Sequence, residues 1–549
     1  MPLPAVLAIV ALLLAPPATA VPPPGGAPKP PAAGSVPGAA TTAPAVPADG
    51  VQVVVPASHA DLLKSGAEGR VLVFLLSTDS REGPRPLDAP FFLDPQPMYS
   101  VGPARLEPGK PVVVGADAMA FPVPMAELSG RYRVQAVFDR DRTQRGHDVP
   151  GNLASAEATV DFGPGRTDTV TLELTEALKA DPEPSAPNLR FFEMRSPLLS
   201  RAAGRDVTMR AGIALPPGWD DPNFRRRMFP AVYVIPGFGG RAEAAAEYAR
   251  MLAAPGGQAV VPQAAWIVLD PDAPLGHHGF VDSPGNGPRG QALVEELIPE
   301  LERRFRLVRR PEARILTGHS SGGWSSLWLQ LRYPGTFGAC FSSAPDPVDF
   351  RSFQGADLYR DTSVFSDADG KERPSFRTVL AEHFDKVRMT IRQEAAMERV
   401  LGPARDSGEQ WDAWAAMWSA LDPRTKLPKP MFDDVTGTID RMTVKQDWAR
   451  FDVGRLLRED TDRVAPILRT RVRLLCGDRD NFYLDGAVRL LRDDLARIAA
   501  ERASAGRPLP EGPGYVELVP GEDHRSLPAS SMLRWQREMR DHLHANGLD

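Results

Sequence analysis

The stretch ILTGHSSGGWSSLW, residues 315–328, decides the fold of this chain. It begins inside the apolar run ARILTG and continues as an apolar segment at helical spacing, so it predicts a strand that turns sharply into a helix. Gly318, Ser320 and Gly322 match the pattern G-x-S-x-G within that turn. Such a turn brings the backbone on both sides of the serine so close together that the flanking positions have no room for a Cβ. The pattern predicts a nucleophilic Ser320 with an exposed hydroxyl; an ordinary Gly/Ser turn is the alternative.

Apolar runs on both sides of this stretch alternate with segments at helical spacing. Strands that alternate with helices form a mostly parallel, doubly wound α/β sheet with helices on both faces. The runs that predict buried strands are FPAVYVIPG, AAWIVLDPD, ARILTG, FGACFSSAP and VRLLCGD, after an opening antiparallel pair, NLRFFEMRS and DVTMRAGIALP. GQALVEELIPELERRF, residues 290–305, predicts a helix between them because its apolar side chains recur at helical spacing.

The N-terminal third has a different organisation. Residues 1–20 combine an apolar run with a small-residue ending, Ala18-Thr19-Ala20, which predicts a signal peptide and export to the periplasm or medium. Residues 21–50 are rich in Pro and Ala and predict a disordered linker. Residues 51–178 hold short strand patterns punctuated by Gly and Pro, typical of a small all-β sandwich. These patterns are VQVVV, RVLVFLL, PVVVG, RYRVQAVFD, ASAEATVDF and DTVTLEL.

The α/β domain is expected over residues 186–549, with a lid-like helical insertion at about 351–465. Within this insertion, SFRTVLAEHFDKVRMTIRQEAAMERVL and GEQWDAWAAMWSAL both suggest helices. Three tryptophans of the second segment fall on one helix face. Packing against the body of the domain is the simpler interpretation of this face, and an aromatic wall for a substrate pocket is the alternative. The three residues are Trp411, Trp414 and Trp418.

A nucleophilic serine needs a base, and the base needs a carboxylate to orient it. His524 follows GYVELVP, the last predicted strand, in the loop GEDH, and a final helix comes after it. LLCGDRDNFYLDG offers Asp478 and Asp480 just beyond the preceding strand. The order Ser320, Asp480, His524 is the nucleophile, acid and base order of α/β-hydrolases. Two rival carboxylates lie one strand earlier, Asp346 and Asp349.

The oxyanion that forms during acyl transfer needs two backbone donors. The N–H of Ser321, just after the nucleophile, is one candidate. The N–H of Phe238, in the glycine-rich loop after VYVIP, is the other. Gly237 and Gly239 let that backbone approach a substrate, although a plain glycine-rich turn remains open. His278 and Asp282, in GHHGFVDSPGNGPRG, are further candidates for substrate binding.

The composition narrows the classes of function. With 42% hydrophobic and 24% charged residues and a net charge of −6, the chain gives no electrostatic reason to bind nucleic acid. We expect no stable membrane insertion, and the oligomeric state is undetermined. Cys340 and Cys476 both lie in core-strand patterns, so two buried free thiols are expected rather than a disulfide. No motif requires a metal or an organic cofactor.

These segments together resemble the putative esterase family of α/β-hydrolases, which includes S-formylglutathione hydrolases, enterochelin-esterase-like proteins, feruloyl and acetyl-xylan esterases, and mycolyltransferases. The resemblance covers much of residues 190–548. It implies Ser320 as nucleophile, His524 as base and Asp480 as acid, since the family's aspartate precedes an x-Phe pair. The chain departs from the family at Pro236, where a histidine is common, and in the length of its insertion. The segments are FPAVYVIPGFGG, ELIPELERRF, ILTGHSSGGWSSLWLQLRYPGTFGACFSSAP, CGDRDNFYL and GEDH.

The sequence therefore predicts an exported serine esterase that hydrolyses a small-molecule, carbohydrate or lipid ester through an acyl-enzyme. Two alternatives stay open: an acyltransferase that uses the same residues, and a non-catalytic binding protein that has kept the fold. The acyl group, the alcohol and the role of the sandwich are not specified by any motif.

Overall fold

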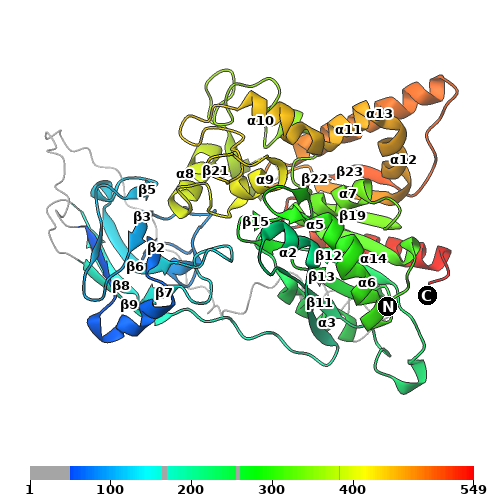
Figure 1. Cartoon of the computed structure of the whole chain (residues 1–549). Coiled ribbons are helices and arrows are strands. Elements are labelled where there is room, and N and C mark those ends of the chain that lie inside the picture. Colours follow the sequence, from blue (N-terminus) through cyan, green and yellow to red (C-terminus); the bar gives the residue numbers. More distant parts are fainter. Residues whose placement is uncertain (1–49, 164–169, 255–259, 382–383, 549) are drawn as a thin grey trace, which may run out of the picture.

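The computed structural model describes residues 50–163, 170–254, 260–381 and 384–548. The predicted signal peptide and nearly all of the predicted linker therefore lie outside the described residues. Figure 1 shows an N-terminal β domain beside a larger α/β domain, with the insertion lying against both. No described helix is long and apolar enough to cross a membrane.

The β domain is all-β, as the strand patterns predict, but it is a single curved sheet rather than the two packed sheets of the predicted sandwich. Its described strands form one curved sheet in the order β4-β1-β9-β7-β6-β2-β3-β5, with β8 paired to β6. The sheet curls around a single apolar cluster to which Val53, Val73, Phe138 and Leu172 contribute from four strands. Two strands were not predicted, β3 and β5. The strands are β1 (Val51–Val54), β2 (Glu68–Ser77), β3 (Met98–Arg105), β4 (Val112–Val114), β5 (Met119–Phe121), β6 (Gly130–Asp139), β7 (Leu153–Ser155), β8 (Ala158–Phe162) and β9 (Val170–Ala177).

The predicted α/β sheet is confirmed. Its strand order is β10-β11-β13-β12-β18-β19-β22-β23, antiparallel at β10, β11 and β13 and parallel from β13 onward. Each buried strand corresponds to one apolar run of the sequence. The strands are β10 (Leu189–Arg195), β11 (Thr208–Ala214), β12 (Ala231–Ile235), β13 (Ala265–Leu269), β18 (Arg314–His319), β19 (Ala339–Ser343), β22 (Val472–Gly477) and β23 (Tyr515–Val519).

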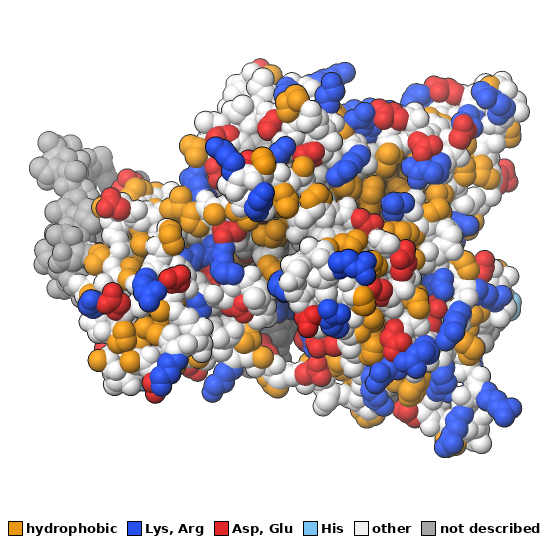
Figure 2. Space-filling view, in the orientation of Figure 1, with side chains coloured by type: hydrophobic (Ala, Val, Ile, Leu, Met, Phe, Trp, Pro, Cys, Tyr) orange, Lys and Arg blue, Asp and Glu red, His pale blue; other side chains and the backbone are white. Residues whose placement is uncertain are grey.

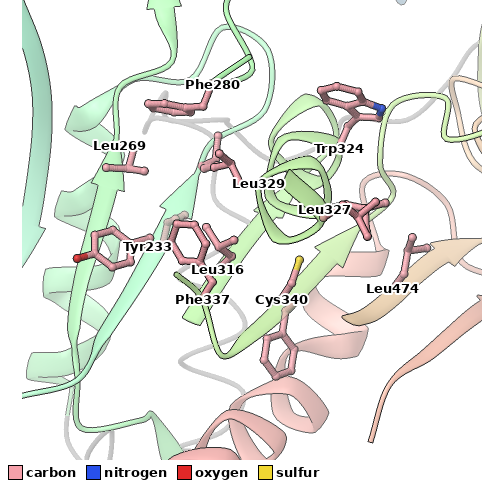
Figure 3. Packing of buried hydrophobic residues seen from close by; sticks show 14 of the residues in the cluster. Tyr233, Leu269, Phe280, Leu316, Trp324, Leu327, Leu329, Phe337, Cys340 and Leu474 are labelled. Carbon is pink, nitrogen blue, oxygen red and sulfur yellow. The ribbon is translucent and has the colours of Figure 1, made fainter. Parts of the chain in front are cut away.

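Helices cover both faces of this sheet. Phe341 of β19 packs on Trp535 of α14, while Cys340 points toward the side of α7 (Figure 3). Since neighbouring strand residues point to opposite faces, α7 and α14 lie on opposite sides of the sheet. The helices of the sheet are α2 (Pro197–Ala203), α3 (Ala245–Ala253), α5 (Arg289–Ala292), α6 (Ile298–Phe305), α7 (Ser321–Arg332), α12 (Thr461–Arg471), α13 (Asp485–Ser504) and α14 (Leu527–Ala545).

The two cysteines are free and buried, as expected. Their strands are neighbours, but Cys340 pairs in register with Val472 rather than with Cys476. Four residues along a strand correspond to about 13 Å, which is too far for a disulfide.

The insertion between β19 and β22 is only partly helical. The prediction of a helix from residue 375 is wrong, because β20 (Pro374–Ala381) and β21 (Phe384–Thr390) form a hairpin before α8 (Ile391–Leu401). Thr390 ends the hairpin and caps α8, since its hydroxyl accepts from Gln393 N and the Gln393 side chain accepts from Thr390 N. The other helices are α9 (Gln410–Trp418), α10 (Arg441–Gln446) and α11 (Val453–Glu459).

The β domain packs on the insertion through a shared apolar cluster. Phe74, Met98 and Phe91 of the β domain join Met397 and Leu401 of α8 in this cluster. Ion pairs flank it: Arg70 and Arg142 both contact Asp406 of the insertion. The β domain is thus held against the edge of the sheet at which the strands end.

Candidate active site

Ser320 occupies the predicted turn between β18 and α7. Its backbone has φ 59° and ψ −127°, a conformation that non-glycine residues rarely adopt. A Cβ on Gly322 would lie 1.9 Å from the carbonyl oxygen of Ile235, and one on Gly318 would lie 2.2 Å from that of Gly322. Both flanking positions therefore require glycine. These two close contacts are the steric reason for the G-x-S-x-G pattern. Ser320 is partly exposed, and it lines a cavity.

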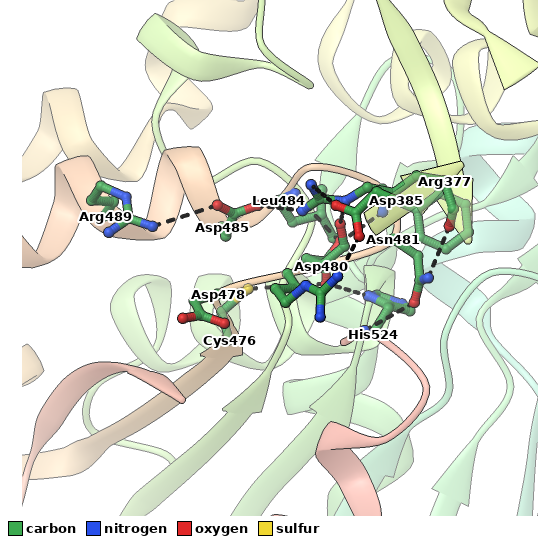
Figure 4. Close-up of polar contacts among 12 residues, drawn as sticks. Arg377, Asp385, Cys476, Asp478, Asp480, Asn481, Leu484, Asp485, Arg489 and His524 are labelled. Atoms are coloured by element: carbon green, nitrogen blue, oxygen red, sulfur yellow. Dashed lines mark hydrogen bonds and ion pairs between the residues drawn. The ribbon is translucent and has the colours of Figure 1, made fainter. Parts of the chain in front are cut away.

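His524 and Asp480 meet above the ends of β22 and β23. The Nδ1 atom of His524 lies 2.7 Å from Oδ2 of Asp480, and Asp480 is fully buried (Figure 4). Oδ1 of Asp480 accepts a hydrogen bond from Phe482 N at 2.8 Å. The backbone N–H of His524 donates to Oδ1 of Asn481, so the two loops brace each other. His524 lines the same cavity as Ser320.

The rival carboxylates make other contacts. Asp478 accepts from Gly521 N, and so holds the loop that carries His524 without touching its ring. Asp346 accepts from the Ser321 hydroxyl and from Trp414 Nε1, beneath the serine turn. Asp349 binds Arg351 and Arg458. Of the candidates, the structure brings only Asp480 to the histidine.

The glycine-rich loop after β12 lies against the serine. A Cβ on Gly237 would lie 3.2 Å from the Cβ of Ser320, and both Gly237 and Phe238 line the cavity. Ser321 is the first residue of α7, where backbone N–H groups have no partner within the helix. The positions predicted as oxyanion donors are thus on either side of Ser320.

His277 supports this loop from behind. Its Nδ1 accepts from Gly279 N, which leaves Nε2 protonated to donate to the Pro236 carbonyl oxygen at 3.0 Å. Burial lowers the pKa of His277 to about 4, so the ring is neutral at pH 7.

Three other predicted residues do not line the cavity. Gly239 has φ 80° and faces Arg145, whose Nη2 would lie 3.6 Å from an added Cβ. His278 is buried beneath Phe280, 4.6 Å between ring centroids, where its Nδ1 accepts from Phe280 N. Asp282 accepts from Tyr333 Oη and Gln291 N at the surface. Local packing thus turns His278 and Asp282 away from Ser320.

A second histidine, His319, packs beside the first. Its ring lies 4.3 Å from that of His524, and its Nδ1 is 2.9 Å from the Ser343 hydroxyl. Burial, with a smaller effect from His524, holds the pKa of His319 well below its usual range. Because the His319 ring is neutral, it does not repel the positive charge that His524 carries when it is protonated.

The cavity has a volume of about 300 Å³ and is closed by parts of the chain that sequence reasoning missed. Pro90 and Phe92 reach it from the β domain, and the Phe92 ring packs edge-on against Phe376 and Phe482. No local motif marks them, since the contact forms only when the β domain docks. Trp414 lines the cavity, whereas Trp418 packs on Trp324 of α7 and Trp411 packs on Phe432 within the insertion. Both interpretations of that helix face therefore hold in part. The insertion also supplies Gln354, Glu394, Met397, Glu398, Leu401, Glu409 and Gln410.

Comparison with known protein families identifies the family of this chain. The profile of the Putative esterase family matches residues 200–487, just over half of the chain. This chain belongs to that family. No curated protein matches the sequence.

Several solved structures have similar folds. An S-formylglutathione hydrolase from Agrobacterium tumefaciens is 15% identical with a TM-score of 0.36, over 66% of this chain and 98% of its own. A ferulic acid esterase from Anaeromyces mucronatus is 13% identical with a TM-score of 0.33, over 66% and 95%. The BES protein from Bacillus cereus is 13% identical with a TM-score of 0.31, over 66% and 99%. At these values the similarities say nothing of what this family member acts on.

Proposed function

We propose that this protein is a serine esterase that hydrolyses a carboxylic ester through an acyl-enzyme on Ser320. The proposal rests on one observation: Ser320, in a strained turn, lines the same cavity as His524, and His524 is bound to the buried Asp480. Membership of an esterase family supports it.

In the proposed reaction the Ser320 hydroxyl attacks the ester carbonyl carbon while Nε2 of His524 takes its proton. Asp480 keeps the other ring nitrogen protonated and stabilises the imidazolium. The N–H groups of Phe238 and Ser321 stabilise the oxyanion. Collapse of the tetrahedral intermediate breaks the bond to the alcohol oxygen, which receives the proton from His524. Water then repeats the sequence on the acyl-enzyme and releases the acid.

A series of p-nitrophenyl esters, from acetate to longer acyl chains, tests this proposal. Replacement of Ser320 by Ala should lower kcat by about 10⁴-fold or more, whereas Ser530→Ala, at an exposed serine of α14, should leave it unchanged. A serine-reactive fluorophosphonate should label the unaltered protein and not the Ser320→Ala variant. Failure of a folded, unaltered protein to label would favour the non-catalytic binding role.

Whether water or another hydroxyl accepts the acyl group is a separate measurement. Hydrolysis predicts that the free acid forms at the rate of p-nitrophenol release even when glycerol or a sugar is added. Transfer of most of the acyl group to the added alcohol would favour the acyltransferase. The N-terminal pattern of residues 1–20 adds the proposal that the enzyme acts outside the cytoplasm.

A further inference from the structure

The cavity beside Ser320 is lined by four acidic side chains. Asp346, Glu394, Glu398 and Glu409 all contribute to it, and no Lys or Arg stands among the described residues that line it. On the outer face in Figure 2, by contrast, acidic and basic side chains are interspersed. Acidic residues alone do not identify a ligand, so the partners of each carboxylate decide what the cavity can hold.

Three of the four carboxylates already have partners in the protein. Both oxygens of Glu398 accept from the first turn of α9, from Trp411 N at 2.8 Å and Asp412 N at 3.2 Å. Asp346 accepts from Ser321 and Trp414. Glu409 lies 3.7 Å from Nη1 of Arg145, which reaches it from the β domain.

Glu394 is different. It is 2% exposed. The Ser375 and Trp411 side chains approach it as hydrogen-bond donors, but its Oε2 has no partner at hydrogen-bond geometry among the described residues. Gln354, 3% exposed, also lines the cavity, and its Oε1 has no partner within the part of the chain that the structure describes. A buried acceptor without a hydrogen bond destabilises the protein, and most buried polar atoms in proteins have a hydrogen-bond partner. Two of the unsatisfied atoms on this wall are acceptors, and a third, Nε2 of Gln410, is a donor. A ligand with several N–H or O–H donors and an acceptor, such as an ester carbonyl, would therefore complete the cavity.

The aromatic side chains in the rest of the cavity wall favour a ligand that is both a cation and a hydrogen-bond donor. Phe92, Trp414 and Phe482 line the same space, and aromatic faces attract cations. The described residues contain no group of three or more His, Cys, Asp or Glu that could hold a metal ion. A primary ammonium carries three donors and a positive charge, and it therefore matches the open acceptors, the surplus of carboxylates and the aromatic rings together.

We propose that this cavity binds the ammonium group of an ester that carries a primary amine, with Glu394 and Gln354 accepting its N–H groups. The inference rests on the proposed ester hydrolysis at Ser320 and specifies its substrate class. The amine can belong to the acyl part or to the alcohol part of the ester, and two substrate pairs separate these sources.

In each pair a methyl group replaces the ammonium. The acyl-side pair is p-nitrophenyl 6-aminohexanoate and p-nitrophenyl heptanoate; the alcohol-side pair is 6-aminohexyl acetate and heptyl acetate. We expect kcat/KM for the amino ester to exceed that of its neutral partner by about tenfold or more in one pair, the effect of a single charge-assisted contact. A ratio at or below one in both pairs would overturn the inference.

Variants at Glu394 link the preference to the cavity. These measurements are made at pH 8, above the pKa of Glu394 of about 7, so that its carboxylate is charged. There Glu394→Gln should reduce the ratio by about tenfold, and Glu394→Asp, which keeps the charge, should retain more of it. Glu372→Gln, at an exposed glutamate of the same insertion, is the matched control and should leave the ratio unchanged. Circular dichroism and thermal unfolding check that each variant is folded. A ratio that survives in folded Glu394→Gln would also overturn the inference.

A binding measurement tests the cation site independently of the proposed ester hydrolysis. Isothermal titration calorimetry of the Ser320→Ala variant should show n-hexylamine binding at least about tenfold more tightly than n-hexanol. If the unaltered protein hydrolyses no ester while hexylamine keeps this preference, the proposed function fails and the cation site stands. If esters are hydrolysed and hexanol binds as well as hexylamine, the cation site fails and the esterase stands.

Discussion

The guanidinium carbon of Arg145 lies 4.9 Å from the centroid of the Phe238 ring, so a residue of the β domain packs on the loop proposed to hold the oxyanion. Nε of Arg145 also donates to Asp272 at 2.9 Å, which fixes the guanidinium over the ring. The side chain is 15% exposed, and its ion pairs with Asp272 and Glu409 offset the free-energy cost of burying its charge. The β domain thus contributes both a wall of the cavity and support for its backbone donors.

Replacement of Arg145 by Ala should lower kcat for p-nitrophenyl acetate by about 10- to 100-fold, because small displacements of a positioned backbone donor are costly to catalysis. Arg145→Lys should rescue little, since an ammonium lacks the planar group that stacks on Phe238. Arg131→Ala, at an exposed arginine of the same domain, is the control. An unchanged kcat in folded Arg145→Ala would show that the loop holds its shape without the β domain.

Asp480→Asn should lower kcat by about 10³- to 10⁴-fold with little change in KM, because an amide no longer keeps His524 in the tautomer that accepts the serine proton. Asp478→Asn, two residues away, should lower kcat by less than about tenfold, since Asp478 only holds the loop through Gly521 N. Steady-state kinetics on p-nitrophenyl acetate compares the two. Equal losses would mean that the acid has been assigned to the wrong carboxylate.

Phe92→Ala should open the cavity toward the β domain. We expect KM to rise more for long-chain than for acetyl esters, because only the longer chains reach the wall formed by Phe92 and Phe482. Leu380→Ala, at an exposed position of the neighbouring hairpin, provides the comparison. A uniform change over the ester series would instead indicate a general loosening of the domain contact.

Glu394 should make the protein less stable as the pH rises. Burial, and to a smaller extent Glu409, raises the pKa of Glu394 from 4.5 to about 7 in the folded state. The folded protein therefore holds a proton that the unfolded chain releases between pH 4.5 and 7, and stability falls through this window. Glu394→Gln should raise the free energy of unfolding by about 1–3 kcal/mol at pH 8 and by much less at pH 4.5. Denaturant titrations at both pH values measure this, and an equal effect at both would contradict it.

Gly322→Ala should prevent the serine turn from forming. The added Cβ would lie 1.9 Å from a backbone oxygen that cannot move without displacing β12. We expect a loss of at least about 3 kcal/mol in the free energy of unfolding, together with loss of activity. Gly335→Ala is the matched control, because an added Cβ there meets nothing within 4 Å. Similar stability of the two variants would contradict the steric account of the turn.

Much of the α/β domain could be predicted because its signals are local. A buried strand needs a short apolar run, and each such run became a strand of the sheet. The serine turn has a steric requirement within five residues, so Gly318, Ser320 and Gly322 predicted it without knowledge of the rest of the chain. The helical pattern from residue 375 failed for a physical reason: the apolar side chains of a hairpin that packs between two domains follow its contacts, and they can mimic helical spacing.

The sequence by itself determined the sheet, the serine turn and the positions in the chain where a base and an acid could follow. Tertiary structure alone decided the rest. Asp478 and Asp480 stand two residues apart in one loop, and only the packing of that loop turns Asp480 toward His524 while Asp478 binds Gly521. Phe92, Arg145 and Glu394 are far from Ser320 in the chain and belong to no motif. Phe92 and Arg145 reach the site because the β domain docks on the insertion that carries Glu394. This docking is driven by apolar burial spread over many residues, so no short stretch of sequence predicts it.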